Sequence, residues 1–207
     1  MQHFPTSLFV TGTDTGIGKT VVSAMLTQAL SATYWKPIQS GLEEETDTQF
    51  VKRVTELPDS QFVKERFQLT EPLSPHASAA IDGVEIKMND FKLPEFDTEN
   101  LIVEGAGGLM VPMNGKDMII DLISYLDLPA LLVSRSELGT LNHTFLSLEA
   151  MRERDIEILG VVMNGPKNES NRKAIEKYGN IDVLAEIPSM NELGPESLQE
   201  CFDTEFC

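Results

Sequence analysis

A glycine-rich segment near the N-terminus, Gly12-Thr-Asp-Thr-Gly-Ile-Gly-Lys-Thr20, contains residue types that suit phosphate binding. It follows a short apolar run and precedes an amphipathic stretch, which is the strand-loop-helix setting of a P-loop. Gly16 and Gly18 let the backbone bend so that successive N–H groups face phosphate oxygens. Lys19 would then reach the terminal phosphates, and the Thr20 hydroxyl would bind magnesium. The general pattern has its first glycine at position 13, which is a threonine here, so a glycine-rich turn capping an ordinary helix is the alternative.

Two acidic positions could complete a magnesium site beside such a loop. Glu104 ends the apolar run Leu101-Ile-Val-Glu and precedes Gly105-Ala-Gly-Gly108, a loop able to approach phosphate closely. A P-loop needs a carboxylate at this place, although a glutamate on an exposed turn is the alternative. Asp47 lies in the acidic run 43–47, and a run of acids is usually a solvated face. Composition alone does not distinguish Asp47 from its neighbours.

Two further segments carry polar groups at predicted strand or helix ends. In Lys36-Pro-Ile-Gln-Ser-Gly41, proline favours an extended backbone at Lys36, and a lysine there could stabilise charge on a transferred phosphoryl group. A surface lysine is an equally good explanation. In Leu138-Gly-Thr-Leu-Asn-His143, a loop enters a predicted helix whose free N–H groups could bind a carboxylate. Ordinary helix capping explains that segment as well.

The elements that must position these residues alternate along the chain, since short apolar runs rich in branched residues are followed by longer amphipathic stretches. The strands are expected at Leu8–Thr11, within Tyr34–Ile38, and at Leu101–Glu104, Ala130–Ser134, Leu159–Asn164 and Val183–Ile187. The helices are expected at Lys19–Ala32, Asp117–Leu126, Thr140–Arg154 and Glu169–Tyr178. This alternation predicts an α/β fold with a mostly parallel sheet flanked by helices on both faces, as in P-loop NTPases. Ligands then collect at the carboxyl ends of the strands.

Domain organisation is predicted to be simple. The length of 207 residues fits one domain spanning 1–207. The proline-rich segment 57–96 is interpreted as an irregular excursion within that domain. The acidic tail 196–207 is predicted either to form a final short helix or to fray.

The composition narrows the functional classes. The 16 basic and 33 acidic side chains leave a formal charge of −17, which argues against general binding to nucleic acid or anionic membrane. The two cysteines, Cys201 and Cys207, lie in the last seven residues and cannot frame the fold. No apolar run approaches the roughly 20 residues that span a bilayer. These features predict a cytoplasmic protein.

Taken together, the motifs resemble one family, the dethiobiotin synthetases of biotin biosynthesis. The resemblance covers most of the chain and rests on an ordered set of segments: 11–20, 36–41, Glu71-Pro-Leu-Ser-Pro-His76, Val103-Glu-Gly-Ala-Gly-Gly108, 138–143 and Val162-Met-Asn164. Each segment alone is weak evidence for the family, but the ordered set is specific to it. The shifted first glycine, irregular for a general P-loop, matches this family's own form.

The resemblance implies an ATP-dependent ring closure that converts 7,8-diaminononanoate and carbon dioxide into dethiobiotin, ADP and phosphate, with Mg²⁺. One amine captures carbon dioxide as a carbamate, the γ-phosphoryl group activates it as a mixed anhydride, and the second amine closes the cyclic urea. The protein then chiefly positions groups and neutralises charge. The family also implies a homodimer.

Site residues follow from the resemblance by position. Lys36 and Lys19 are implied to be catalytic, and magnesium ligands are implied at Thr20, Asp47 and Glu104. Contacts to ATP are implied for Gly16, Ile17, Gly18, Lys19, Thr20, Val21, Asp47, Glu104, Gly105, Ala106, Gly107, Asn164, Gly165, Pro188, Ser189 and Met190. Contacts to the diamine are implied for Thr15, Lys36 and Ser40 and, from the partner subunit, for Gly139, Thr140, Leu141 and Asn142.

The chain departs from the family pattern at two places. Gly16 stands where many members have an acidic residue, and the segment 188–190 lacks the aromatic residue of some members.

The main alternative families are the partition and cell-division switch ATPases. These usually carry an additional lysine early in the loop, where this chain has Thr13 and Asp14. Asn164-Gly-Pro-Lys does not give the guanine-reading pattern of GTPases. Cobalamin amide-forming enzymes join a related domain to an amidotransferase domain, for which this chain is too short.

Overall fold

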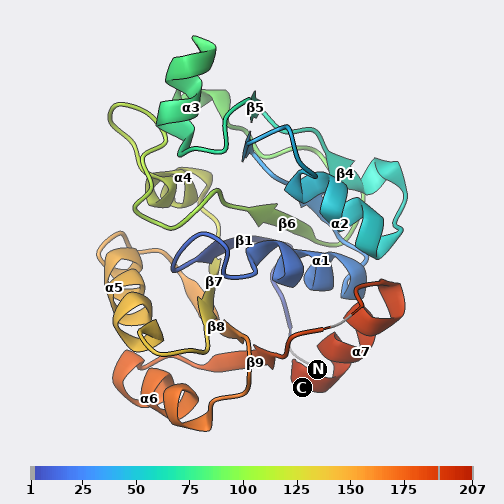
Figure 1. Ribbon diagram of the computed structural model, residues 1–207, viewed down its shortest axis with the longest axis vertical. Coiled ribbons are helices and arrows are strands. Elements are labelled where there is room, and N and C mark those ends of the chain that lie inside the picture. The colour runs from blue at the N-terminus through green and yellow to red at the C-terminus, as the bar shows by residue number, and fades with distance from the viewer. Residues whose placement is uncertain (1–2, 191, 207) are drawn as a thin grey trace.

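A seven-stranded parallel sheet forms the centre of the protein in the computed structural model, which describes residues 3–190 and 192–206. The strand order is β4-β2-β6-β1-β7-β8-β9, and each neighbouring pair is parallel. The strands span Phe62–Val63 (β4), Thr33–Trp35 (β2), Leu101–Glu104 (β6), Ser7–Gly12 (β1), Ala130–Arg135 (β7), Ile158–Asn164 (β8) and Val183–Ile187 (β9). The predicted fold class is therefore confirmed, and β1 and β6 lie side by side at the middle (Figure 1).

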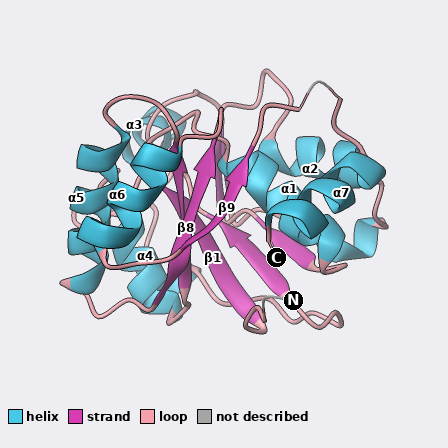
Figure 2. Cartoon of the chain, turned by 90° about the horizontal axis from the view of Figure 1, so that it is seen from below, coloured by secondary structure: helices cyan, strands magenta, loops and turns pink. Residues whose placement is uncertain are grey.

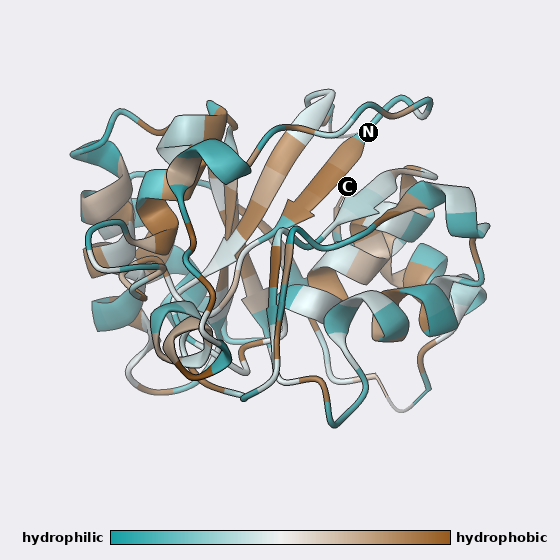
Figure 3. Cartoon of the chain, turned by 90° about the horizontal axis from the view of Figure 1, so that it is seen from above, coloured by the Kyte–Doolittle hydropathy of each residue, from teal (hydrophilic) through white to brown (hydrophobic). Residues whose placement is uncertain are grey.

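Helices cover both faces of this sheet (Figure 2). One face carries α1 (Lys19–Ala29), α2 (Asp47–Thr55) and α7 (Pro195–Glu205), and the other carries α4 (Ile119–Leu126), α5 (Thr140–Arg152) and α6 (Glu169–Gly179). Successive strand residues point to opposite faces. Leu8 and Val10 of β1 accordingly join one buried apolar cluster, while Phe9 joins the other. Figure 3 shows the apolar strands enclosed between helices of mixed hydropathy.

The segment 57–96 contains more regular structure than the sequence predicts. A two-stranded parallel sheet pairs β3 (Ile38–Ser40) with β5 (Phe67–Leu69). Helix α3 (Pro75–Asp82) and two short 3₁₀ turns, Asp59–Gln61 and Met88–Asp90, complete this part. The single strand expected within Tyr34–Ile38 is wrong in one respect, because the chain leaves the main sheet at Lys36-Pro37 and Ile38 begins β3 in the second sheet.

All four predicted helices are wrong at one end, and α6 differs least, since it ends at Gly179 rather than Tyr178. Helix α1 ends at Ala29 rather than Ala32, α4 begins at Ile119 rather than Asp117, and α5 ends at Arg152 rather than Arg154. At the end of α1, Ser31 adopts a positive φ of 46°, and the Ala32 N–H donates to the Thr27 carbonyl. Before α4, the Asn114 side chain accepts from the Asp117 N–H and holds a turn. Helices α2 and α3 were not predicted.

The ends of the described chain pack together. Helix α7 gives the acidic tail a regular conformation, which confirms the helical alternative. Phe4 contacts Phe202 of this helix and its C-cap residue Phe206 at ring-centroid distances of 6.1 and 5.8 Å. Cys201 is half-buried on α7, whereas Cys207 lies outside the described residues. Within the described ranges, no helix has both the length and the hydropathy needed to cross a bilayer.

Candidate active site

The glycine-rich loop joins β1 to α1 at the carboxyl edge of the sheet. Gly16 and Gly18 adopt positive φ values of 71° and 95°, which glycine tolerates without a Cβ penalty. Gly18 is the N-cap of α1, and the Asn164 side chain from the end of β8 packs against it. A Cβ at Gly18 would lie 2.1 Å from Asn164 Nδ2, so glycine is also required sterically. The loop therefore presents the free N–H groups of α1 at the sheet edge.

Lys19 opens α1 and is buried rather than extended into solvent. Its ammonium donates to the Asp14 carbonyl at 2.8 Å. Burial, together with the positive charge of Lys36, lowers the pKa of Lys19 to about 8, although nearby carboxylates act in the opposite direction. A lysine so placed gains much from a nearby phosphate, because the anion would compensate its desolvation.

Four side chains from separate elements meet next to this lysine: Thr20, Lys36, Asp47 and Glu104. Thr20 Oγ1 lies 3.0 Å from Asp47 Oδ1 and 2.9 Å from Glu104 Oε1. Lys36 Nζ donates to Glu104 Oε1 at 3.0 Å and to the Gly105 carbonyl at 3.1 Å, and it also forms an ion pair with Asp47. Both Lys36 and Glu104 are buried, so these contacts are protected from water.

The sheet explains how Lys36 and Glu104 meet. Tyr34 of β2 is in register with Ile102 of β6, and both side chains belong to the apolar cluster beneath α1. Lys36 and Glu104 each lie two residues further along and thus turn toward the same face. Burial excludes the alternatives that Lys36 is a surface lysine and that Glu104 is an exposed glutamate on a turn.

Asp47 reaches the group from the start of α2. Thr46 and Gln49 form a reciprocal capping box that begins this helix at Asp47. The Gln39 side chain from β3 accepts a hydrogen bond from the Asp47 N–H at 3.2 Å. The alternative of a uniformly solvated acidic run is wrong for Asp47, because its side chain is two-thirds buried while Glu43, Glu44 and Glu45 are exposed.

The charges in this group stabilise one another. Burial disfavours the charged form of Lys36, but the Glu104 and Asp47 carboxylates outweigh this cost and raise the pKa of Lys36. Burial likewise opposes ionisation of Asp47, yet Lys36, Thr20 and Lys19 hold its pKa below the ordinary value. Lys36, with its raised pKa, and Asp47, with its lowered pKa, are therefore both charged at neutral pH.

The donor set fits a magnesium ion. Thr20, Asp47 and Glu104 provide one hydroxyl and two carboxylate groups, and Mg²⁺ prefers such hard oxygen ligands. They lie directly beside the phosphate-binding loop, where a magnesium ion would also meet the phosphates of a nucleotide. The Lys36 ammonium contacts the same two carboxylates, which shows that this position attracts positive charge.

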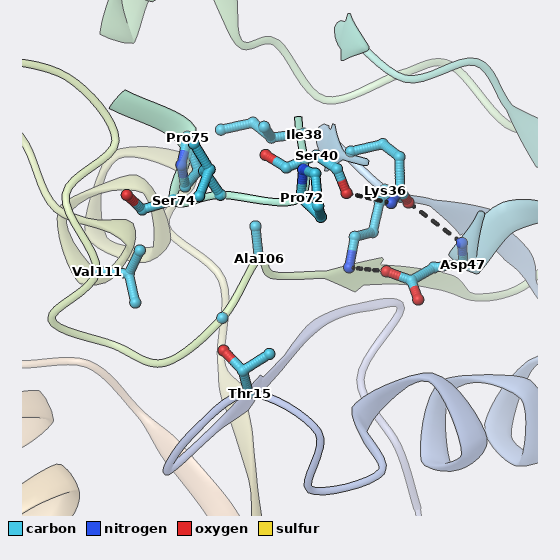
Figure 4. Close-up of a pocket in the computed structure, with 13 residues that line it drawn as sticks. Thr15, Lys36, Ile38, Ser40, Asp47, Pro72, Ser74, Pro75, Ala106 and Val111 are labelled. Carbon is cyan, nitrogen blue, oxygen red and sulfur yellow. Dashed lines mark hydrogen bonds and ion pairs between the residues drawn. The ribbon is translucent and has the colours of Figure 1, made fainter. Parts of the chain in front are cut away.

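A cavity of about 330 Å³ opens next to Lys36 (Figure 4). Thr15, Ser40, Asp47, Ala106 and Gly107 line it together with Lys36, as do Ile38, Gln39, Pro72, Leu73, Ser74, Pro75 and Val111. The Ser40 hydroxyl is buried on this wall without a protein hydrogen-bond partner. The cavity thus combines an apolar wall with a few polar groups, as expected for a small-molecule site.

The predicted base-binding segments lie at the ends of β8 and β9. Asn164 Nδ2 donates to the Ile17 carbonyl at 2.9 Å, and the Gly165 N–H donates to the Ile187 carbonyl at 2.9 Å. Pro188, Ser189 and Met190 follow directly after β9. A smaller cavity of about 220 Å³ lies between Gly16, Ile17, Arg135, Glu137 and Asn164. The loop, β8 and β9 thus meet on the side of the loop away from Lys36.

The predicted partner-facing segment does not line the main cavity. Gly139 is the N-cap of α5, with Thr140, Leu141 and Asn142 in the first turn. Leu138, directly before it, is fully exposed. Met110 and Leu146, which line another cavity together, are each more than half exposed. Neither Met110 nor Leu146 lines the main cavity, although Val111 borders both cavities.

Several residues that line the cavity or position the site were not predicted from the sequence. Pro72, Leu73, Ser74 and Pro75 belong to a segment that was recognised only as a family motif and was given no role. The capping box Thr46-Asp-Thr-Gln49 could have indicated that a helix begins at Asp47. The two-residue spacing between Tyr34 and Lys36 could have indicated that both side chains face Glu104.

Comparison with solved structures shows the fold. The chain resembles the cell-division protein MinD from Pyrococcus horikoshii complexed with Mg-ADP, with a TM-score of 0.57, 16% identity, and coverage of 94% of this chain and 86% of that one. It also resembles a ParA family ATPase from Chlorobium tepidum, with a TM-score of 0.50, 13% identity, and coverage of 98% and 91%. At such low identity these similarities concern architecture alone.

Comparison of sequences identifies the family. An AAA domain model matches residues 6–197. The ATP-dependent dethiobiotin synthetase of Brucella ovis is 49% identical over 199 residues, which cover 96% of this chain and 93% of the relative. That of Brucella abortus is 48% identical with the same coverage. The ordered motifs, the P-loop fold and these relatives together place the chain in the AAA domain family and, within it, among the ATP-dependent dethiobiotin synthetases.

Proposed function

We propose that the protein uses ATP to join 7,8-diaminononanoate and carbon dioxide into the cyclic urea of dethiobiotin, releasing ADP and phosphate. The observation that carries this proposal is the meeting of Lys36, Asp47 and Glu104 between the phosphate-binding loop and the 330 Å³ cavity. A phosphoryl donor on the loop and an organic acceptor in the cavity would then meet at Lys36. The identity of the acceptor follows from the relatives, which are dethiobiotin synthetases.

The reaction proceeds in three chemical steps. One amine of the substrate attacks carbon dioxide and loses a proton, which gives a carbamate. A carbamate oxygen then attacks the γ-phosphorus of ATP, and ADP leaves as a carbamic-phosphoric anhydride forms. Finally, the second amine attacks the carbonyl carbon, phosphate leaves, and the amine loses a proton as the ring closes.

The two lysines serve the second and third steps in this proposal. Lys36 neutralises charge that develops between the carbamate and the transferred phosphoryl group, since it lies on the cavity wall and remains charged. Lys19, which opens α1 beside this group, binds the terminal phosphates. Bound magnesium, held by Thr20, Asp47 and Glu104, would supply charge neutralisation and orientation of the phosphates.

Substrate and nucleotide contacts complete the proposal. Thr15 and Ser40 hold the diamine or its carbamate, consistent with the buried and unpartnered Ser40 hydroxyl. Residues 16–21 and 105–107 surround the phosphates, while Asn164, Gly165 and residues 188–190 surround the adenine. The start of α5 at residues 139–142 receives the substrate carboxylate within a homodimer, because its free N–H groups favour an anion.

The proposal is tested by following ADP release from purified protein supplied with magnesium ATP and bicarbonate, with and without 7,8-diaminononanoate. ADP release that requires the diamine supports the synthetase function. ADP release unaffected by the diamine would contradict it and would favour a switch ATPase. The variant Lys92→Ala, which removes an exposed lysine away from the site, serves as a purification control.

A further inference from the structure

The Tyr34 phenol is completely buried under α1 and reaches the Glu104 carboxylate. Its hydroxyl donates to Glu104 Oε2 at 2.9 Å. The other carboxylate oxygen, Oε1, lies within hydrogen-bond distance of Thr20 and Lys36. The two oxygens of Glu104 therefore have separate partners, one in the sheet and one in the active site.

The strand register fixes this arrangement. Tyr34 is directly opposite Ile102, and Glu104 lies two residues further along the same face of β6. The phenol thus spans the diagonal between neighbouring strands, a distance within reach of an aromatic side chain. The ring packs near Phe62, with centroids 6.3 Å apart. Packing therefore holds the ring, and only the hydroxyl extends to the carboxylate.

The hydroxyl is not needed to fill space. Phenylalanine would occupy almost the same volume in this apolar cluster, but it would leave Glu104 Oε2 without this donor. Glu104 is buried, and a buried carboxylate that loses a donor is free to turn toward its remaining partners. The tyrosine hydroxyl thus restrains the direction in which Oε1 points.

We propose that Tyr34 is a positioning residue that orients the Glu104 carboxylate, so that Oε1 faces Thr20 and the magnesium–nucleotide complex. This inference rests on the proposed function, because it requires Glu104 to bind magnesium. Residues that orient metal ligands typically contribute 10–100-fold to metal affinity. Tyr34 acts through Glu104 and contacts neither the phosphates nor the diamine in this account.

The test compares wild type with Tyr34→Phe, which removes only the hydroxyl. Binding of ADP to the full chain is measured by calorimetry, first in EDTA and then over a series of Mg²⁺ concentrations. We expect Tyr34→Phe to raise the Mg²⁺ concentration for half-maximal enhancement of ADP binding by roughly tenfold. The ADP affinity in EDTA should stay within about twofold of wild type, since the loop itself is unchanged.

The matched control is Thr33→Val on the same strand. Thr33 is also buried, and its hydroxyl lies 2.8 Å from Thr98 Oγ1, away from Glu104. A general loss of stability would affect both variants, whereas only Tyr34→Phe should change the Mg²⁺ requirement. An equal Mg²⁺ requirement in wild type and Tyr34→Phe would overturn the inference. Binding of ADP by wild type that does not depend on Mg²⁺ would overturn the magnesium assignment itself, so the two failures are distinguishable.

A second measurement does not require a Tyr34 variant to fold. The chain has three tyrosines, and Tyr125 and Tyr178 are exposed, so a 3-fluorotyrosine label gives one buried reporter at Tyr34. We expect the Tyr34 fluorine resonance to move when Mg²⁺ is added to the ADP complex and to respond much less in Glu104→Gln. A Tyr34 resonance that does not respond to Mg²⁺ in the otherwise normal protein would contradict the inference.

Discussion

At the level of single residues, the site depends on buried charges that compensate one another. Lys36 touches both carboxylates, and Lys19 lies nearby with a depressed pKa. Removing one member of such a group leaves its partner buried without compensation. Charge-changing substitutions should therefore affect stability as well as turnover, and the two effects must be measured separately.

Lys36→Ala is expected to lower kcat by on the order of 10²- to 10³-fold, because it deletes the positive charge at the acceptor side of the phosphoryl group. The same change should lower the melting temperature, since Glu104 and Asp47 lose their common partner. Steady-state kinetics and a thermal melt check both effects, with Lys92→Ala as the control. Near-normal kcat in a folded Lys36→Ala protein would exclude the proposed role.

Near pH 8, nucleotide binding should be accompanied by proton uptake at Lys19. Its pKa in the free protein is about 8, so the fraction without a proton rises as the pH passes through this value. Burial lowers this pKa most and Lys36 lowers it further, whereas Glu104, Asp47 and Asp14 raise it. Phosphates added beside Lys19 would also raise it. Binding would then restore the lost proton above about pH 8 and would take up little at pH 6.

Calorimetry of ADP binding in buffers of different ionisation enthalpy measures this uptake. Lys19→Arg is the matched control, because arginine stays charged throughout the range. Uptake at pH 8.5 that is as large in Lys19→Arg as in wild type would contradict the assignment to Lys19.

At the level of elements, the loop from β1 to α1 contains two glycines whose replacement by alanine should have different effects. Both Gly16 and Gly18 have positive φ, and an alanine in that region costs about 1–2 kcal/mol. Gly16 faces open space, whereas a Cβ at Gly18 would collide with Asn164. Gly18→Ala is therefore expected to weaken ADP binding by more than tenfold, and Gly16→Ala by much less, in calorimetric titrations. Equal effects of the two substitutions would show that the contact with Asn164 is unimportant.

The sequence predicted the central elements well because their hydrophobic patterns are strong. Strands β6 and β9 have the predicted bounds, and β1, β7 and β8 differ from the prediction by one residue at one or both ends, whereas the short edge strand β4 was not predicted. Buried parallel strands give continuous apolar runs, which local patterning detects. Helix α2 was not predicted because its nine residues begin within an acidic run. That run was interpreted as a solvated face, and the capping box at Thr46 was overlooked.

The second sheet could not be predicted in the same way. Strands β3 and β5 have three residues each, and Ile38 pairs with Phe67, far along the chain. Such short strands exist because of long-range pairing and packing, which no local pattern encodes. Local sequence patterns do not predict the cavity either, because Pro72 and Ser74 line it only when this second sheet is formed.

At the level of the whole molecule, the apolar surface beside α5 bears on assembly. Leu146 and Met110 line one cavity and are both more than half exposed, and Leu138 is exposed just before the segment proposed to receive the partner's substrate. Large exposed apolar patches commonly mark interfaces. The single-domain organisation of 1–207 and the cytoplasmic location stay predictions.

Leu146→Glu is expected to convert a dimer into a monomer and to raise the KM for the diamine several-fold, because a buried unpaired charge would oppose association. Analytical ultracentrifugation and kinetics check the two effects. Tyr178→Glu places the same charge at another exposed apolar residue, on α6, and should leave both unchanged. A Leu146→Glu dimer with wild-type KM would exclude this surface as the interface.

Isotope labelling of the carbon atom that closes the ring tests the proposed reaction. Purified protein is given magnesium ATP, 7,8-diaminononanoate and ¹³C-bicarbonate, and mass spectrometry follows the product while ADP is counted. The proposed reaction predicts dethiobiotin that carries the label in its urea carbon, with ADP formed in equal amount. Hydrolysis of ATP without formation of labelled dethiobiotin would exclude the proposed reaction, whatever the affinity of the site for nucleotide.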